Sequence, residues 1–178
     1  MPIKKFSIAG AAGNLEGVAH LPDEAPRAIA VVAHPLPTMG GTMDNKVVTT
    51  LAKTFAELGC VALRFNFRGV GASGGGFDSG NGEIEDVLAT VRHARQEYGG
   101  LPLILSGFSF GAYVQARAAQ HLHPHPHRLV LIAPAVGRFA MPPVRHDTLL
   151  VHGELDDVVP LADVLEWARP LHLPIVVL

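Results

Sequence analysis

The chain has 178 residues, of which 48% are hydrophobic and 17% charged, and its formal net charge is −2. This composition excludes an intrinsically disordered chain, and the charge excludes the strongly basic surface typical of nucleic-acid-binding proteins. No apolar run approaches the roughly 18 residues of a membrane-spanning helix, so we expect no membrane association and a cytoplasmic protein. The single cysteine, Cys60, opens an apolar run and is predicted to be buried.

The N-terminal part of the chain predicts three strands and a helix. Residues 3–9 and 15–21 are typical of two strands joined as a hairpin at the edge of a sheet. The unbroken apolar run at residues 28–33 predicts a central parallel strand that is covered on both faces. Apolar residues at helical spacing predict a helix over residues 43–58, which ends at Gly59.

The rest of the chain continues this alternation. Strands are predicted at residues 61–67, 103–106, 129–133, 148–152 and 174–178, and helices at 83–98, 110–120 and 161–168. Repeated strand–helix–strand units indicate an α/β fold: a mostly parallel, doubly wound sheet of about eight strands with helices on both faces. We interpret residues 1–178 as one domain. The short connection between residues 133 and 148 leaves no room for a lid domain.

The strongest motif is the pentapeptide Gly-Phe-Ser-Phe-Gly at residues 107–111, between a predicted strand and a predicted helix. In that context a serine occupies a sharp turn, and its hydroxyl lies beside the N–H groups of the helix start. The flanking glycines, Gly107 and Gly111, would let strand and helix approach without a Cβ clash. We therefore predict that Ser109 is a nucleophile; the alternative is an ordinary glycine turn.

Two further loops follow predicted strands at the same edge of the sheet. After the strand at 148–152, Asp156 or Asp157 could orient a histidine, and we prefer Asp156. The alternative is that either aspartate only caps the following helix, and Asp157 is the better candidate for that. After the strand at 28–33, the N–H of Leu36 is predicted to form an oxyanion hole with the N–H of Phe110. His34 is expected to hold this loop by hydrogen bonding rather than act as a base.

Together these motifs resemble small lidless α/β-hydrolases. The resemblance rests on four segments in the right order, at residues 34–48, 64–73, 107–113 and 153–156. It implies the α/β-hydrolase fold with its second strand antiparallel, a Ser–His–Asp triad, no cofactor, and hydrolase or esterase activity on small acyl compounds. On this resemblance, Ser109 and Asp156 are carried over as catalytic residues.

The catalytic histidine of such hydrolases follows the last strand, before a final helix. Here the last predicted strand ends at Leu178, and His172 precedes it. We consider three accounts: a C-terminally truncated domain whose final helix is missing and whose histidine lies beyond residue 178, a natural short form with little or no activity, or a substitute base such as His34 or His152. We favour the first account. Sheet surface left uncovered could also drive formation of a homodimer.

Three other features receive simpler interpretations. The alternating histidines at positions 121, 123, 125 and 127 predict a solvated loop, and we expect no biological metal site. The glycine-rich segment 69–82 lacks the phosphate-binding pattern, and its residues 74–76 are interpreted as a flexible loop near the site. The apolar side chains near the motifs predict an acyl pocket; they are Met39, Phe108, Phe110 and Tyr113.

The sequence therefore predicts a serine hydrolase, resembling a carboxylesterase, that cleaves small ester substrates. The alternative is a non-catalytic binding or interaction protein that uses the same cleft without turnover. A haloperoxidase-like or thioester-cleaving activity is a third hypothesis, because a fold does not determine its chemistry.

Overall fold

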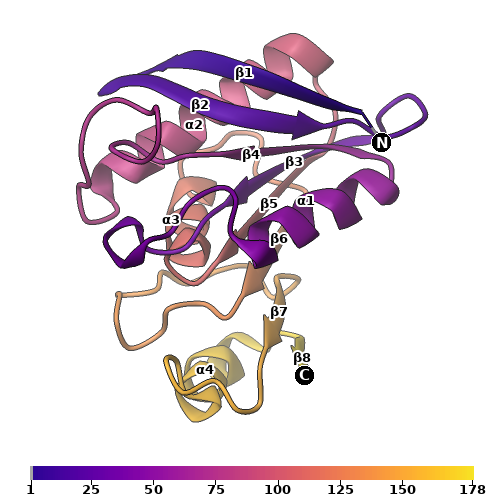
Figure 1. Ribbon diagram of the computed structural model, residues 1–178. Coiled ribbons are helices and arrows are strands. Elements are labelled where there is room, and N and C mark those ends of the chain that lie inside the picture. The colour runs from indigo at the N-terminus through magenta and orange to yellow at the C-terminus, as the bar shows by residue number, and fades with distance from the viewer. Residues whose placement is uncertain (1) are drawn as a thin grey trace.

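The protein forms a single eight-stranded sheet with helices on both faces (Figure 1), as the sequence predicted. The computed structural model describes residues 2–178. The strand order is β1-β2-β4-β3-β5-β6-β7-β8. The strands span Ile3–Gly10 (β1), Gly13–His20 (β2), Ala28–Ala33 (β3), Cys60–Phe65 (β4), Leu103–Phe108 (β5), Arg128–Ile132 (β6), Leu149–His152 (β7) and Ile175–Val177 (β8). β2 is antiparallel to both β1 and β4, and the other neighbouring pairs are parallel.

Alternate residues of the central strands fill two separate cores. In β3, Ala30 and Val32 pack with the face of α1, whereas Ile29 and Val31 belong to the larger core that includes α2 and α3. The α-helices span Lys46–Glu57 (α1), Asn81–Tyr98 (α2), Phe110–Ala119 (α3) and Leu161–Ala168 (α4), and short 3-10 helices span Pro37–Met39 (η1) and Arg169–Leu171 (η2). Because β3 is buried on both faces, its sequence shows no polar–apolar alternation.

Several element boundaries differ from the sequence prediction, and two of them have identifiable reasons. α1 begins at Lys46 instead of residue 43, because the side chain of Asn45 accepts a hydrogen bond from the N–H of Val47 at 2.9 Å and caps the helix there. β5 continues through Gly107 to Phe108, because its backbone pairs with β6 up to Ile132. The strand therefore runs directly into Ser109.

The glycine-rich segment after β4 is tied to the N-terminal hairpin. The N–H of Gly69 donates to the carbonyl of Gly74 at 3.0 Å, and the N–H of Gly74 donates to Asn14 at 2.8 Å. Gly13 and Gly74 lie so close that a Cβ on either would meet the other's Cα at 3.0 Å. Gly74, the first residue of the expected flexible loop, is therefore hydrogen-bonded to β2 and packed against it.

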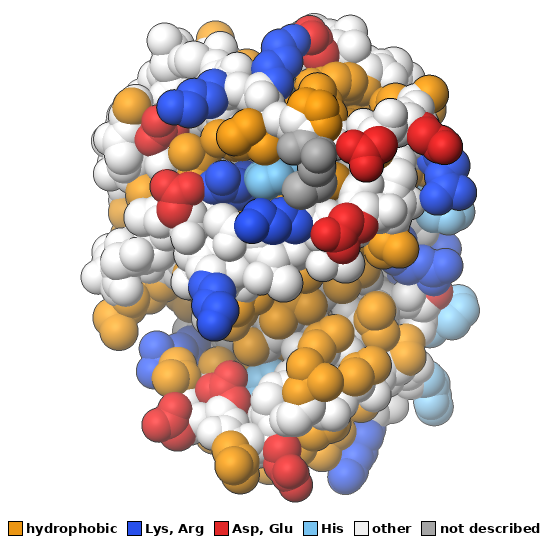
Figure 2. Space-filling model, turned by 45° about the vertical axis from the view of Figure 1, so that its right-hand side comes forward, with side chains coloured by type: hydrophobic (Ala, Val, Ile, Leu, Met, Phe, Trp, Pro, Cys, Tyr) orange, Lys and Arg blue, Asp and Glu red, His pale blue; other side chains and the backbone are white. Residues whose placement is uncertain are grey.

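One sheet face carries apolar side chains that no helix fully covers. Beyond α1, Ile104, Phe108 and Val130 are only partly buried, and Val176 in β8 is 45% exposed. Figure 2 shows hydrophobic side chains gathered across this side of the molecule at the height of β6 and β7. No helix within residues 2–178 is both long and apolar enough to cross a membrane.

Candidate active site

Ser109 occupies a strained backbone position between β5 and α3. Its φ of 55° and ψ of −113° lie in a region that side-chain-bearing residues rarely adopt. The N–H of Ser109 donates to the carbonyl of Ile132 at 2.9 Å, and its own carbonyl accepts from Ala112 at 3.0 Å. These bonds anchor the turn to β6 and to the first turn of α3, so that the serine stands at the carboxyl edge of the parallel strands.

The two glycines of the motif permit this turn. A Cβ on Gly107 would overlap the backbone of Gly111, and a Cβ on Gly111 would overlap the carbonyl oxygen of Ala33. Both positions therefore allow close backbone approach, as the sequence predicted. Since Gly111 packs on the end of β3, the start of α3 and the loop after β3 are held together.

Ser109 lines a small, mostly apolar cavity of about 100 Å³. The other lining residues are Pro35, Leu36, Met39, Phe110, Ala135, Arg138, Phe139 and Val158. Met39 and Phe110 were expected there. Phe108 and Tyr113 were also expected but do not line the cavity.

Phe108 and Tyr113, which were expected in the cavity wall, pack elsewhere. Phe108, at the end of β5, packs on the core beneath α1, on the other face of the sheet. Tyr113 stacks on Phe139 with ring centroids 4.8 Å apart, so it packs against a residue of the cavity wall without lining the cavity itself. Phe139 and Arg138 come from the irregular connection between β6 and β7, which gave no periodic signal in the sequence.

The two residues whose N–H groups are expected to bind an oxyanion lie in the wall of the same cavity. Leu36 and Phe110 both line it with Ser109. Within residues 2–178, neither N–H donates a hydrogen bond to another backbone group. The carbonyl of Leu36, in contrast, accepts from Met39 and Gly41, each at 3.0 Å. The carbonyl oxygen of Leu36 is therefore engaged within the loop, whereas the N–H of Leu36 remains available to a ligand.

His34 is fully buried behind this loop and is unsuited to act as a base. Its Nε2 accepts a hydrogen bond from the N–H of Phe67 at 3.1 Å, and its Nδ1 lies 2.7 Å from the carbonyl oxygen of Pro35. Burial lowers the pKa of His34 to about 4, although the bond to Pro35 acts in the opposite direction. Both ring nitrogens are engaged with the main chain, which agrees with the expected structural role.

Asp156 lies in the loop after β7 and is partly exposed. Its Oδ1 accepts from the N–H groups of Val158 and Val159, both at 2.9 Å, and its Oδ2 lies 3.9 Å from Nε2 of the buried His152. The same Nε2 is 2.8 Å from the carbonyl oxygen of Val159, so His152 also holds this loop. Asp157 is exposed. The expectation that Asp157 caps α4 is wrong, because the N-cap is Pro160 and no side chain caps that helix.

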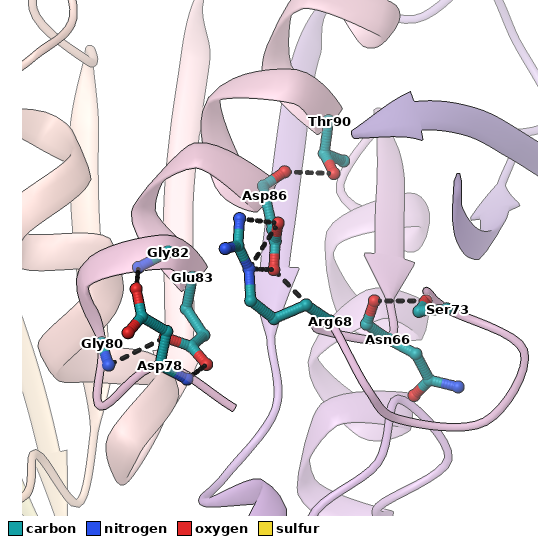
Figure 3. A network of polar contacts seen from close by, with 9 residues as sticks. All are labelled: Asn66, Arg68, Ser73, Asp78, Gly80, Gly82, Glu83, Asp86 and Thr90. Carbon is teal, nitrogen blue, oxygen red and sulfur yellow. Dashed lines mark hydrogen bonds and ion pairs between the residues drawn. The ribbon is translucent and has the colours of Figure 1, made fainter. Parts of the chain in front are cut away.

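A buried ionic network fixes the segment that leads from β4 to α2 (Figure 3). The carboxylate of Asp86 accepts from the N–H of Arg68 at 3.0 Å and from its guanidinium at 2.8 to 3.1 Å. Glu83, also fully buried, accepts from the N–H groups of Asp78 and Gly80 at 2.9 and 2.8 Å. This network was not predicted from the sequence, because it pairs an arginine in a loop with a carboxylate in the interior of a helix.

The network places one aromatic side chain beside the start of α3. Phe77 lies in the segment that Asp78 and Glu83 anchor, and its ring centroid is 5.7 Å from that of Phe110. Phe77 is 38% exposed, whereas Phe110 is fully buried. Phe77 therefore covers the first helical residue after the nucleophile.

The histidine tract lies away from Ser109, after the far end of α3. His121, His123, His125 and His127 are all exposed. In the described part of the chain, no three potential metal-ligating side chains gather at one point. A cavity of about 250 Å³ opens nearby, between α3 and the segment that precedes β7.

The chain matches the family model described as serine aminopeptidase, S33, over residues 24–145. It belongs to this hydrolase family. The match covers the strand and loop of Leu36, the elbow of Ser109 and the cavity wall at Phe139. The family assignment and the fold agree in making this a small α/β-hydrolase without a lid.

Similar proteins come from several bacteria. A lidless α/β serine hydrolase from Xanthomonas campestris is 37% identical, with a TM-score of 0.93 over 100% of this chain and 85% of that one. An α/β serine hydrolase homologue from Coxiella burnetii is 38% identical, with a TM-score of 0.86 over 98% and 86% of the two chains. An uncharacterized protein of Rickettsia prowazekii is 33% identical over 170 residues, which are 91% of this chain and 71% of that protein.

Proposed function

We propose that this hydrolase cleaves small ester substrates through a Ser–His–Asp mechanism. Ser109 is the nucleophile, Asp156 orients the histidine, and the N–H groups of Leu36 and Phe110 bind the oxyanion. The observation that carries the proposal is the strained turn at Ser109, on the wall of a cavity that it shares with Leu36 and Phe110. A cavity of about 100 Å³ suits a short acyl group.

In this mechanism the hydroxyl oxygen of Ser109 attacks the ester carbonyl carbon while the histidine takes its proton. The carbonyl oxygen becomes the oxyanion, which the two N–H groups stabilise. Collapse of the tetrahedral intermediate breaks the bond to the alcohol, which leaves with the proton from the histidine. Water then attacks the acyl-serine in the same way and releases the acid.

The histidine is proposed to follow Leu178 in the full-length protein. The N–H of Glu154 donates to the carbonyl of Leu178 at 2.8 Å, so the end of β8 lies beside the loop of Asp156. Asp156 Oδ1 is engaged by backbone N–H groups, which leaves Oδ2 for such a histidine. His34 and His152 are poor substitutes, because each is buried and bonded to the main chain.

The test is covalent labelling of the full-length protein with a fluorophosphonate probe, followed by intact mass. We expect one adduct on Ser109, none on the Ser109→Ala variant, and hydrolysis of p-nitrophenyl acetate by the wild type only. An aminoacyl p-nitroanilide belongs in the same assay, because the family description names an aminopeptidase. Faster cleavage of that amide would overturn the ester preference, and unchanged ester turnover in Ser109→Ala would overturn the mechanism.

A second candidate is a non-catalytic binding protein that uses the same cavity. The observation in its favour is that no histidine is among the described residues that line the cavity with Ser109. This function predicts a full-length protein that takes up no probe and turns over no ester, yet is stabilised against heat by an ester or its acid. Labelling at Ser109 would exclude it.

A further inference from the structure

The peptide bond between Pro35 and Leu36 is held in one orientation by a buried side chain. Because the N–H of Phe67 donates to Nε2 of His34, that nitrogen carries a lone pair and the ring proton lies on Nδ1. Nδ1 therefore donates to the carbonyl oxygen of Pro35 at 2.7 Å. The ring cannot rotate without losing both bonds.

This bond determines where the N–H of Leu36 points. The only cis peptide within residues 2–178 precedes Pro124, so the peptide between Pro35 and Leu36 is trans. In a planar trans peptide, the C=O and the N–H point in opposite directions. With its carbonyl directed at the His34 ring, the peptide directs the Leu36 N–H away from that ring, on the side free of backbone acceptors.

Two further contacts restrict the same peptide. Gly41 lies against the carbonyl oxygen of Pro35 so closely that a Cβ there would overlap it. The ring of Phe67 meets His34 edge-on at 4.6 Å between centroids, and it also contacts Phe110 at 5.8 Å. His34 and Phe67 therefore connect the segments that carry both proposed oxyanion donors.

We propose that His34 is a positioning residue: its Nδ1–H fixes the Pro35–Leu36 peptide so that the Leu36 N–H points at the substrate oxyanion. This role rests on the proposed function of the site. It predicts that loss of the bond from Nδ1 lowers kcat about 100-fold with little change in KM, because a misplaced donor weakens binding of the transition state more than that of the substrate.

Two substitutions test the roles of the two ring nitrogens of His34 separately. In His34→Asn, the amide N–H can take the place of Nδ1–H and donate to Pro35, but nothing accepts from Phe67. In His34→Gln, the longer amide can accept from Phe67 in place of Nε2, but the donor to Pro35 is lost. If His34 had only a structural role, kcat would fall in each variant in proportion to its loss of thermal stability. The positioning role predicts that Asn restores kcat to within about tenfold of the wild type and Gln does not.

The discriminating measurement is the ratio of the hydrolysis rates of p-nitrophenyl acetate and its thiono analogue. The C=S sulfur of the thiono analogue fits an oxyanion hole poorly. We expect the wild-type preference for the C=O ester to fall about tenfold or more in His34→Gln and to persist in His34→Asn. If both variants keep the wild-type preference, the positioning role is overturned. Should His34→Gln fail to fold, Gly41→Ala, whose Cβ would press on the same carbonyl oxygen, must show the same loss.

A measurement without turnover separates this inference from the proposed function. The amide ¹⁵N resonance of Leu36 should shift in His34→Gln and stay near its wild-type position in His34→Asn. Absence of fluorophosphonate labelling in the wild type would contradict the proposed hydrolase mechanism. The Leu36 resonance would even then show whether His34 orients the Pro35–Leu36 peptide. An unshifted resonance in His34→Gln would overturn the inference even in an active enzyme.

Discussion

A methyl group on Gly111 would lie 2.6 Å from the carbonyl oxygen of His34. The first turn of α3 and the loop after β3 therefore touch through bare backbone. We expect Gly111→Ala to cost about 1–3 kcal/mol of stability by overpacking and to reduce fluorophosphonate labelling, because it separates Phe110 from Leu36. Gly76→Ala is the matched control, since its Cβ would meet nothing within 4 Å. Equal labelling of the two variants would contradict this account.

The buried pair of Arg68 and Asp86 gives a prediction for stability. The side chain of Asp86 is fully buried and that of Arg68 is 10% exposed. Asp86→Asn leaves the guanidinium without its counter-charge, so we expect a loss of about 3–5 kcal/mol in urea unfolding. Asp147→Asn, which breaks partly exposed ion pairs with Arg145 and Arg128, should cost about 1 kcal/mol or less. Similar losses for both variants would show that burial does not matter here.

The two neighbouring aspartates of the β7 loop should behave differently. Asp156→Asn removes the carboxylate proposed to orient the histidine, and we expect kcat for ester hydrolysis to fall about 10⁴-fold in the full-length protein. Asp157→Asn should stay close to wild type, because the exposed Asp157 caps no helix. Melting temperatures of both variants show whether loss of the bonds to Val158 and Val159 contributes. A larger effect at position 157 would reassign the acid.

Acid should destabilise the fold through His34. Its pKa falls from 6.5 to about 4 on folding, so the neutral form contributes stability that is fully present above pH 6.5 and is lost as the pH falls toward 4. The contribution is at most about 3 kcal/mol. His34→Asn should be less stable than wild type at neutral pH, and the gap should narrow on acidification. A gap in unfolding free energy that is the same at every pH would contradict the prediction. His20, whose pKa is also lowered by burial, is present in both proteins and cancels in the comparison.

The sequence was sufficient for the sheet and the elbow, because strand periodicity and the glycines around Ser109 are local signals. It was not sufficient for the cavity wall. Phe139 and Arg138 belong to an irregular connection, and only the tertiary fold brings them to Ser109.

The buried network was also invisible in the sequence. In the sequence, Asp86 is an ordinary polar residue of a predicted helix, and only the fold brings Arg68 into contact with it. The same limitation explains the mistaken role of Asp157, since the chain could cap α4 at either aspartate and in fact caps it with neither.

The backbone of Ser109 has a consequence for how this protein would respond to selection for heat resistance. Its φ of 55° with ψ of −113° costs a side-chain-bearing residue about 1–3 kcal/mol, a penalty that glycine largely avoids. Ser109→Gly should therefore raise the melting temperature while abolishing probe labelling; a lower melting temperature would mean that the turn is not strained. In a mutant library screened only for thermal stability, glycine would be enriched at position 109. The most stable members of that library would then lack the very hydroxyl that the strained turn holds in place.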